Sequence, residues 1–132
     1  MSELQLIDFG KIGSLELGYL TIAQSPEIQF PIKRVYWTYY SPNEVIRGHH
    51  AHKNLQQLLV AVSGQIIVKI ENIKGEKFEY VLDKPSIGLY IPPFHWRTLQ
   101  MSHSAVLLCL ASEEYNEDDY IREYEEFKQY SK

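Results

Sequence analysis

The sequence has few cysteines, little net charge and no long apolar run, and each of these absences excludes a class of protein. It contains a single cysteine, Cys109, among 132 residues, so no internal disulfide can form. The formal net charge of −4 argues against a general nucleic-acid binder or a protein that docks on anionic membranes. No window approaches the ~20 apolar residues that a membrane span needs. We therefore expect a globular protein with no nucleic-acid partner and no membrane partner.

Localisation and domain organisation follow from similar absences. The N-terminus lacks a basic region followed by a long apolar stretch, so we expect no signal peptide. Cys109 lies in the apolar run 105–110, which is typical of a buried thiol and fits a reducing cytoplasm. There is no repeat, linker or low-complexity segment. A chain of this length favours a single domain over residues 1–132.

Short β-type runs separated by turn signals fill most of the chain, with almost no helical periodicity before residue 112. This pattern predicts an all-β sandwich or barrel. The predicted strands are Leu4–Phe9, Gly18–Ala23, Ile32–Tyr40, Val45–His52, Leu58–Ser63, Gln65–Glu71, Lys77–Leu82, Ser86–Ile91, His95–Leu99 and Ala105–Ala111.

The C-terminal segment changes character. Asn116 and the acidic residues 117–119 are typical of a helix N-terminus. Tyr120, Tyr124 and Phe127 then recur at helical spacing. We predict an amphipathic helix over residues 116–129, packed against the barrel or a partner.

The candidate chemistry lies in the segment Arg47-Gly-His-His-Ala-His-Lys53, which holds three of the five histidines. On a β-strand, side chains two residues apart share a face, so His50 and His52 should project together while His49 points away. Two imidazoles on one wall suit either metal ligation or proton transfer near neutral pH. The remaining alternative is a pair of hydrogen-bonded or surface histidines.

This segment resembles the first cupin motif: His50-x-His52, then Gln57, then Gly64, with glutamine where many metal-binding cupins have glutamate. Pro85-Ser-Ile-Gly88 and Ile91-Pro-Pro93 resemble the second motif. Arg97 occupies the register of the last metal ligand, with His95 displaced by two residues, and a guanidinium cannot ligate a metal at protein pH. We therefore favour acid–base histidines over metal ligands and expect no metal, although His95 could complete a site.

Nearly the whole chain is similar to the sugar 3,4-ketoisomerases, the WxcM-like group that acts on dTDP-4-keto-6-deoxy-D-glucose. The matching segments are Phe30-Pro-Ile-Lys-Arg-Val-Tyr36, Arg47-Gly-x-His-Ala-His-Lys53, Gln57, Pro85-x-x-Gly-Leu-Tyr90, Trp96, Leu110-Ala-Ser112 and Asp119-Tyr-Ile-Arg-x-Tyr124. The resemblance implies an RmlC-like cupin jelly-roll β-barrel, here with a short C-terminal helix. It also implies a homodimer, often with N-terminal strands (here within residues 1–30) exchanged between subunits, and no cofactor.

Carried over residue by residue, the family's catalytic histidines fall on His50 and His52. A ketone at C4 acidifies the C3 proton, and its removal gives an enediol(ate) that is reprotonated at C4. We expect His50 to remove the C3 proton and His52 to manage the proton at C4 or on the oxygens. The expected substrate-binding residues are Tyr36, Arg47, Lys53, Gln57, Trp96 and Arg97. Packing or solvated strand ends would also account for Tyr36, Arg47, Lys53 and Trp96. By strand alternation, one of Lys33 and Arg34 must face away from the pocket.

Two departures from the family pattern bear on the product. Leu17 replaces an arginine or tyrosine of the family, and Gln24 replaces a glutamate. In the family, arginine at the first position with histidine at the register of Arg97 goes with galacto products, and tyrosine with arginine goes with gluco products. Leu17 with Arg97 half-resembles the second pair, so we lean toward dTDP-3-keto-6-deoxy-D-glucose.

Three functions stay open on the sequence alone. The first is the 3,4-ketoisomerase, which by resemblance would feed an aminotransferase that supplies deoxyamino sugars for surface polysaccharides such as O-antigen. The second is a 3,5-epimerase-like cupin on the same dTDP-linked 4-keto-6-deoxy sugar. The third is a sugar-nucleotide-binding cupin without catalysis, which the departures at Leu17 and Gln24 keep open. Paired histidines on one strand suit ketoisomerisation better than epimerisation.

Overall fold

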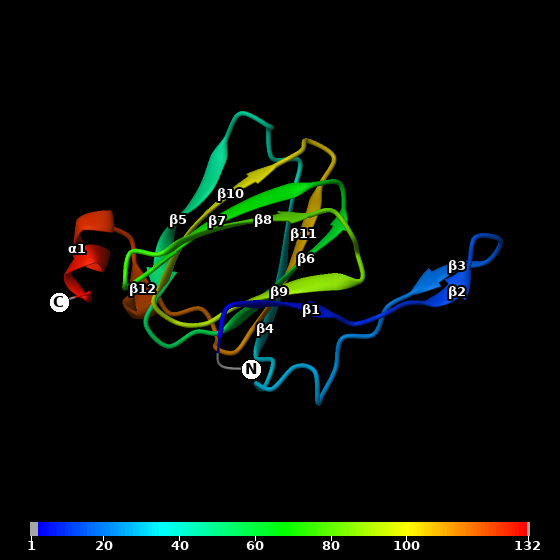
Figure 1. Cartoon of the computed structure of the whole chain (residues 1–132), viewed down its shortest axis with the longest axis horizontal. Coiled ribbons are helices and arrows are strands. Elements are labelled where there is room, and N and C mark those ends of the chain that lie inside the picture. Colours follow the sequence, from blue (N-terminus) through cyan, green and yellow to red (C-terminus); the bar gives the residue numbers. More distant parts are fainter. Residues whose placement is uncertain (1–2, 132) are drawn as a thin grey trace.

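In the computed structural model, which describes residues 3–131, two five-stranded antiparallel sheets face each other (Figure 1). The first sheet has the order β1-β9-β6-β11-β4, and the second the order β12-β5-β10-β7-β8. The strands of the first sheet are β1 (Gln5–Asp8), β9 (Ile87–Ile91), β6 (Gln57–Ser63), β11 (Val106–Ala111) and β4 (Arg34–Tyr39). Those of the second are β12 (Tyr120–Ile121), β5 (Ile46–His52), β10 (His95–Met101), β7 (Ile66–Asn72) and β8 (Lys77–Leu82).

This arrangement confirms the predicted all-β jelly roll, in the form of two facing sheets rather than one closed barrel. Each of the ten predicted strands overlaps an observed strand. The sequence analysis missed β2 (Ile12–Ser14), which pairs with β3 (Gly18–Leu20), and the two-residue strand β12. Both are too short to show an alternating pattern.

The main core lies between the sheets, where inward side chains alternate with outward ones. On β7, Ile66, Val68 and Ile70 are buried, whereas Lys69 between them is exposed. Strand β6 is buried on both faces, because Ile28 and Phe30 cover its outer side at Leu58 and Val60. This double burial explains the unbroken apolar run in β6.

The N-terminal hairpin of β2 and β3 extends away from the two sheets (Figure 1). Its turn carries Leu15 and Leu17, which are 88% and 90% exposed. Apolar side chains this exposed on a projecting arm are typical of a surface that another protein covers.

The predicted helix over residues 116–129 is wrong in its extent. Only α1 (Tyr124–Gln129) is α-helical; residues 117–119 form the 3₁₀ turn η1 (Glu117–Asp119), and Tyr120 and Ile121 pair with β5 as β12. Asn116 caps the 3₁₀ turn, since its side chain accepts from the N–H of Asp118. The pairing with β5 replaces the helical hydrogen bonds that this stretch would otherwise make.

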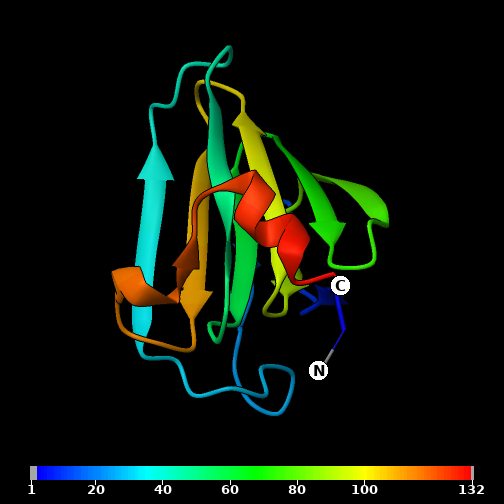
Figure 2. The same ribbon diagram turned by 90° about the vertical axis from the view of Figure 1, so that its left-hand side faces the viewer.

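Helix α1 lies across the outer face of the second sheet (Figure 2). Its Phe127 is fully buried and contacts Trp96 of β10, with a ring-centroid distance of 5.8 Å. The predicted packing of the helix against the sheets is thus confirmed. No helix within residues 3–131 is long and apolar enough to cross a membrane.

Candidate active site

Strand β5 places His50 and His52 side by side on one wall of the interior. Their ring centroids are 4.9 Å apart, and the ring planes are nearly perpendicular. A bulge precedes the pair: the register with β10 shifts between Arg97, opposite His50, and Thr98, opposite Gly48. Gly48 has φ of 90°, and a Cβ there would lie 2.9 Å from the Arg97 carbonyl oxygen, so the bulge needs glycine. The shared wall predicted for the two rings is confirmed.

His49, the third histidine of the cluster, points elsewhere. It has φ of 56°, its side chain is exposed, and its Nε2 lies 3.1 Å from the Ile46 carbonyl oxygen. The expectation that His49 faces away from the other two histidines is confirmed.

His52 is completely enclosed. Its Nδ1 lies 3.2 Å from Oδ2 of Asp119, and its Nε2 is buried with no hydrogen-bond partner. Burial, followed by the charge of Arg97, lowers the pKa of His52 to about 2. His52 is therefore neutral near pH 7, and its contact with Asp119 is a hydrogen bond to a carboxylate rather than an ion pair.

His50 sits closer to the opening. Its Nδ1 lies 3.1 Å from the Gly48 carbonyl oxygen, which can only accept, so Nδ1 carries the proton and Nε2 is bare. Burial, followed by the charge of Arg97, lowers the pKa of His50 to about 4. Both histidines are thus neutral imidazoles, the protonation state that a general base requires.

Arg97 is the cation beside both histidines. It is 1% exposed, and its Nε and Nη2 donate to the His95 carbonyl oxygen at 3.1 and 3.0 Å. Its Nη1 donates to Oε1 of Gln57. Burial lowers the pKa of Arg97 to about 10, so it stays charged near pH 7. These hydrogen-bond partners are neutral, which leaves its charge available to a developing oxyanion.

The first sheet contributes Tyr36, Gln57 and Cys109 to the polar region around the two histidines. Gln57 donates from Nε2 to the Tyr36 hydroxyl at 2.7 Å and to Sγ of Cys109 at 3.3 Å. Burial raises the pKa of Tyr36 and raises that of Cys109 to about 11, so both keep their protons. Tyr36 and Cys109 stand directly opposite each other on β4 and β11.

A cavity of about 470 Å³ opens next to His50 and is rich in guanidinium groups. Arg34 lies between the rings of Tyr36 and Tyr115, 5.2 and 5.7 Å from their centroids, and its Nε and Nη2 are buried without a partner. Arg122 lies 4.1 Å over the Tyr120 ring. The cavity is lined by Arg34, Tyr36, Arg47, Gly48, His50, Tyr115, Tyr120 and Arg122.

The structure brings most of the expected site residues together. Tyr36 and Arg47 line the cavity with His50, and Gln57 and Arg97 lie directly behind it. Trp96 is not there: it points to the opposite face of β10 and packs on Tyr124 and Phe127. Lys53 is not among the lining residues either.

Sequence reasoning assigned no site role to three residues of this region, Asp119, Tyr120 and Arg122, and left Arg34 undecided. Alternation along β4 left open which of Lys33 and Arg34 faces inward; the structure shows Arg34 inside and Lys33 outside, 3.5 Å from Glu113. Tyr120 and Arg122 belong to the matched segment 119–124, which the helix prediction had assigned to packing. Their place in this family-matched segment was the sequence signal that could have identified them as site residues.

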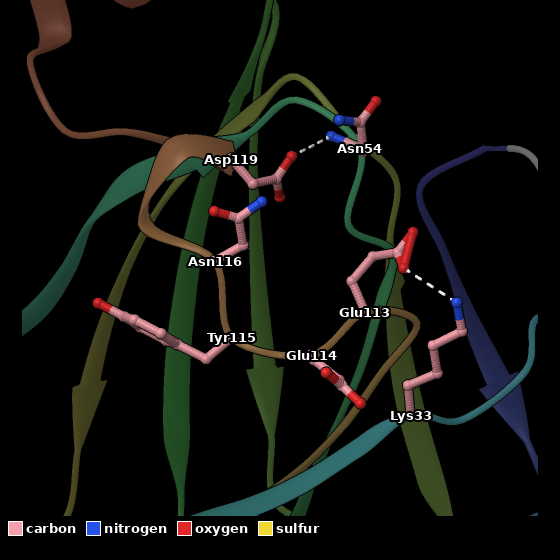
Figure 3. A pocket seen from close by; sticks show the side chains of 7 residues that line it. All are labelled: Lys33, Asn54, Glu113, Glu114, Tyr115, Asn116 and Asp119. Atoms are coloured by element: carbon pink, nitrogen blue, oxygen red, sulfur yellow. Dashed lines mark hydrogen bonds and ion pairs between the residues drawn. The ribbon is translucent and has the colours of Figure 1, made fainter.

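A second cavity, of about 650 Å³, lies beside Asp119 (Figure 3). It is lined by Lys33, Asn54, Glu113, Glu114, Tyr115, Asn116 and Asp119. Its three carboxylates make it a poor place for an anionic diphosphate, in contrast to the arginine-lined cavity.

Within residues 3–131, no cluster of three or more His, Cys, Asp and Glu side chains is arranged to hold a metal ion. Nδ1 of His95, the residue that could have completed a metal site, lies 2.8 Å from the Pro93 carbonyl oxygen. The absence of any cofactor from the reaction stays a prediction.

Comparison with known proteins agrees with this geometry. The family model described as WxcM-like, C-terminal, matches residues 2–132. A curated relative from Aneurinibacillus thermoaerophilus, TDP-4-oxo-6-deoxy-alpha-D-glucose-3,4-oxoisomerase, is 40% identical over 97% of this chain and 92% of its own. The chain belongs to the WxcM-like family of sugar 3,4-ketoisomerases.

Solved structures of this family superpose closely on the chain. A 3,4-ketoisomerase from Helicobacter canadensis has a TM-score of 0.91 and 34% identity, covering 99% of this chain and 98% of its own. A mutant of the 3,4-ketoisomerase from Thermoanaerobacterium thermosaccharolyticum, in complex with TDP-4-keto-6-deoxyglucose, has a TM-score of 0.91 and 37% identity, covering 97% and 93%. A dTDP-4-dehydrorhamnose 3,5-epimerase from Bacillus anthracis, 16% identical with a TM-score of 0.78 over 89% and 77%, shares the fold alone.

Proposed function

We propose that this protein is an isomerase that converts dTDP-4-keto-6-deoxy-D-glucose to dTDP-3-keto-6-deoxy-D-glucose. The observation that carries the proposal is a pair of neutral imidazoles, 4.9 Å apart, next to a buried guanidinium whose hydrogen-bond partners are neutral. The relatives named for this chemistry support the choice of substrate.

The reaction moves one proton between two neighbouring carbons. A histidine takes the proton from C3, which the C4 ketone acidifies, and the electron pair shifts to the C4 oxygen to give an enediolate. Reprotonation at C4 and transfer of the hydroxyl proton from O3 to O4 leave a ketone at C3 and a hydroxyl group at C4. We assign the C3 proton to His50, which lines the cavity, and the proton at C4 or on the oxygens to His52, which lies deeper. Arg97 stabilises the enediolate charge.

The diphosphate of the substrate is proposed to lie against Arg34, Arg47 and Arg122. All three line the cavity that contains His50. Two buried nitrogens of Arg34 have no acceptor from the protein, and a phosphate oxygen is the acceptor that a guanidinium prefers. The gluco configuration of the product rests on Arg97, by resemblance to the gluco-type enzymes.

The experiment is proton NMR in D₂O with dTDP-4-keto-6-deoxy-D-glucose. Ketoisomerisation predicts deuterium at C4 and a ketone at C3. Deuterium at C3 and C5 with the C4 ketone retained would instead indicate a 3,5-epimerase, and no exchange would indicate a binding protein. Either of these two results contradicts the proposal. The coupling constants of the proton at C4, measured in H₂O, report the configuration of the product.

We further propose a cytoplasmic homodimer of single cupin domains (residues 1–132), with the hairpin of β2 and β3 packed on the partner subunit. Its exposed Leu15 and Leu17 support a second copy as the occupant, and the reduced, buried Cys109 fits the cytoplasm. Light scattering should give twice the monomer mass, and Leu15→Glu with Leu17→Glu should lower it. A monomeric wild type would contradict the dimer.

A further inference from the structure

The carboxylate of Asp119 is held against His52 by hydrogen bonds to both of its oxygens. Its Oδ1 accepts from the backbone N–H of Asn54 at 2.7 Å (Figure 3), and its Oδ2 accepts from the N–H of Leu55 at 3.2 Å. The same Oδ2 lies 3.2 Å from Nδ1 of His52. Two backbone donors therefore hold the carboxylate in one orientation before His52 is considered.

This environment decides the tautomer of His52. Both backbone contacts come from N–H donors, so each oxygen of the Asp119 carboxylate already serves as an acceptor. The contact at Nδ1 is then favourable only if Nδ1 carries the proton, as in other histidines held by a carboxylate. In a neutral imidazole the lone pair must consequently lie on Nε2.

That Nε2 is the atom left free. It is buried and has no hydrogen-bond partner, in a ring packed 4.4 Å from Tyr120 and 4.9 Å from His50. A buried nitrogen acceptor without a partner is costly, and such a cost is typically retained where a ligand or substrate completes the contact.

We propose that Asp119 is a positioning residue of the ketoisomerase site, which holds His52 as the Nδ1–H tautomer and directs its Nε2 lone pair at the sugar. The expected effect on catalysis rests on the proposed function, whereas the expected tautomer of His52 does not. When Nε2 takes a proton, the carboxylate stabilises the resulting imidazolium. Asp119 touches neither sugar nor diphosphate and acts only through His52.

A purely structural role for Asp119 is the alternative that the experiment must separate. The carboxylate joins the 3₁₀ turn to the loop after β5, and the Asp119 carbonyl accepts from the N–H of Lys53 at 2.9 Å. Loss of activity in a variant could therefore reflect lost packing. The tautomer of His52 and the split between kcat and KM are readouts that packing alone does not move.

The experiment begins with the unaltered protein labelled with ¹⁵N at its histidines. Long-range proton–nitrogen NMR near pH 7.5 distinguishes a protonated ring nitrogen from a bare one, and His52→Asn assigns the signal of His52. We expect a protonated Nδ1 and a bare Nε2. A bare Nδ1 would overturn the proposal, and this measurement needs no variant at Asp119.

The variant is Asp119→Asn, with Asp118→Asn as its matched control. An amide at 119 that still accepts from Asn54 turns its NH₂ group toward Nδ1, which favours the opposite tautomer. We expect kcat to fall about 10²- to 10⁴-fold while KM changes by less than about threefold. Asp118 is exposed, and its side chain contacts neither histidine, so Asp118→Asn should keep kcat within about twofold.

The outcomes separate cleanly. A folded Asp119→Asn protein, by circular dichroism, with an altered His52 tautomer and a reduced kcat supports the proposal. Unchanged kcat, or reduced kcat with the wild-type tautomer retained, overturns it. If Asp119→Asn does not fold, the spectrum of the unaltered protein decides. If the unaltered protein turns over no sugar, the proposed function fails, whereas the tautomer in the free protein still tests the positioning role.

Discussion

The two ends of the interior between the sheets have the same architecture and opposite chemistry. Along β10 the inward side chains change from Arg97 to Leu99 and Met101 within four residues. Along β6 they change from Gln57 to Leu59 and Ala61. One end is an apolar core, and the other carries the histidines, the guanidinium and a tyrosine hydroxyl. Strands β6 and β10 each run through both ends, so their inward side chains divide stability from chemistry.

The polar end is also where hydrogen bonding is incomplete. Of the buried side-chain nitrogens and oxygens that lack a partner within residues 3–131, all but the Ser41 hydroxyl belong to His52 and Arg34. Unpaired buried polar atoms destabilise a fold, so a core selected only for stability would not keep them. We propose that substrate atoms complete these hydrogen bonds, because His52 and Arg34 lie at or next to the cavity.

The largest expected effect is on catalysis and comes from the polar end. Replacing His52 by Asn removes a proton carrier, so we expect kcat to fall about 10²- to 10⁴-fold. The variant should still fold. Steady-state assays with the dTDP sugar measure kcat, and circular dichroism checks the fold. His49→Asn, a change at an exposed side chain, is the control and should keep normal rates. Normal rates in His52→Asn would refute the catalytic assignment.

At the apolar end the expected effect is on stability instead. Leu89 is fully buried, so Leu89→Ala should lower the free energy of unfolding by about 2–5 kcal/mol while kcat of the folded protein is unchanged. Leu6 pairs with Leu89 across β1 and β9 but is half exposed, so Leu6→Ala is the control with a smaller loss. Urea unfolding checks both. Equal losses would mean that Leu89 is not part of the core.

The two ends also differ in their response to acid. In the unfolded chain a histidine binds a proton below pH 6.5, whereas the pKa values of His50 and His52 in the folded protein are lowered to about 4 and about 2. Stability is therefore retained above pH 6.5 and lost as pH falls toward 4. Each histidine contributes up to about 1.4 kcal/mol per pH unit in that window. In His52→Asn, the free energy of unfolding, measured by urea unfolding at several pH values, should fall less steeply as the pH is lowered. An unchanged dependence on pH would contradict a buried, neutral His52.

The smallest effect is expected outside the interior. Trp96 follows His95 on β10 but packs on Phe127 and Tyr124, so Trp96→Phe should leave KM within about twofold and cost less than about 1.5 kcal/mol. Tyr36→Phe, which removes a hydroxyl at the cavity, is the comparison and should raise KM more. A tenfold rise in KM for Trp96→Phe would restore Trp96 to the substrate site, as the family resemblance implied.

Much of this site was accessible to sequence reasoning because it depends on local alternation. His50 and His52 share a face for the same reason that Ile66, Val68 and Ile70 do, and a two-residue period is visible in the sequence. The residue pattern predicted a sandwich or barrel and the paired histidines, whereas the jelly roll and the grouping of Tyr36, Gln57 and Arg97 with them were implied by the family resemblance. The helix was predicted too long because Tyr120, Tyr124 and Phe127 keep helical spacing even though Tyr120 lies in a strand.

The sequence by itself determined most of the strands and the pairing of the two imidazoles on one face, since these follow from neighbouring residues. Only the tertiary structure decided that Asp119, 67 residues after His52, lies against its Nδ1, and that Arg34 rather than Lys33 faces the cavity. The structure also places Trp96 outside the site, packed on Tyr124 and Phe127. The physical reason is that alternation sets which side chains share a face, whereas long-range strand pairing sets which faces meet.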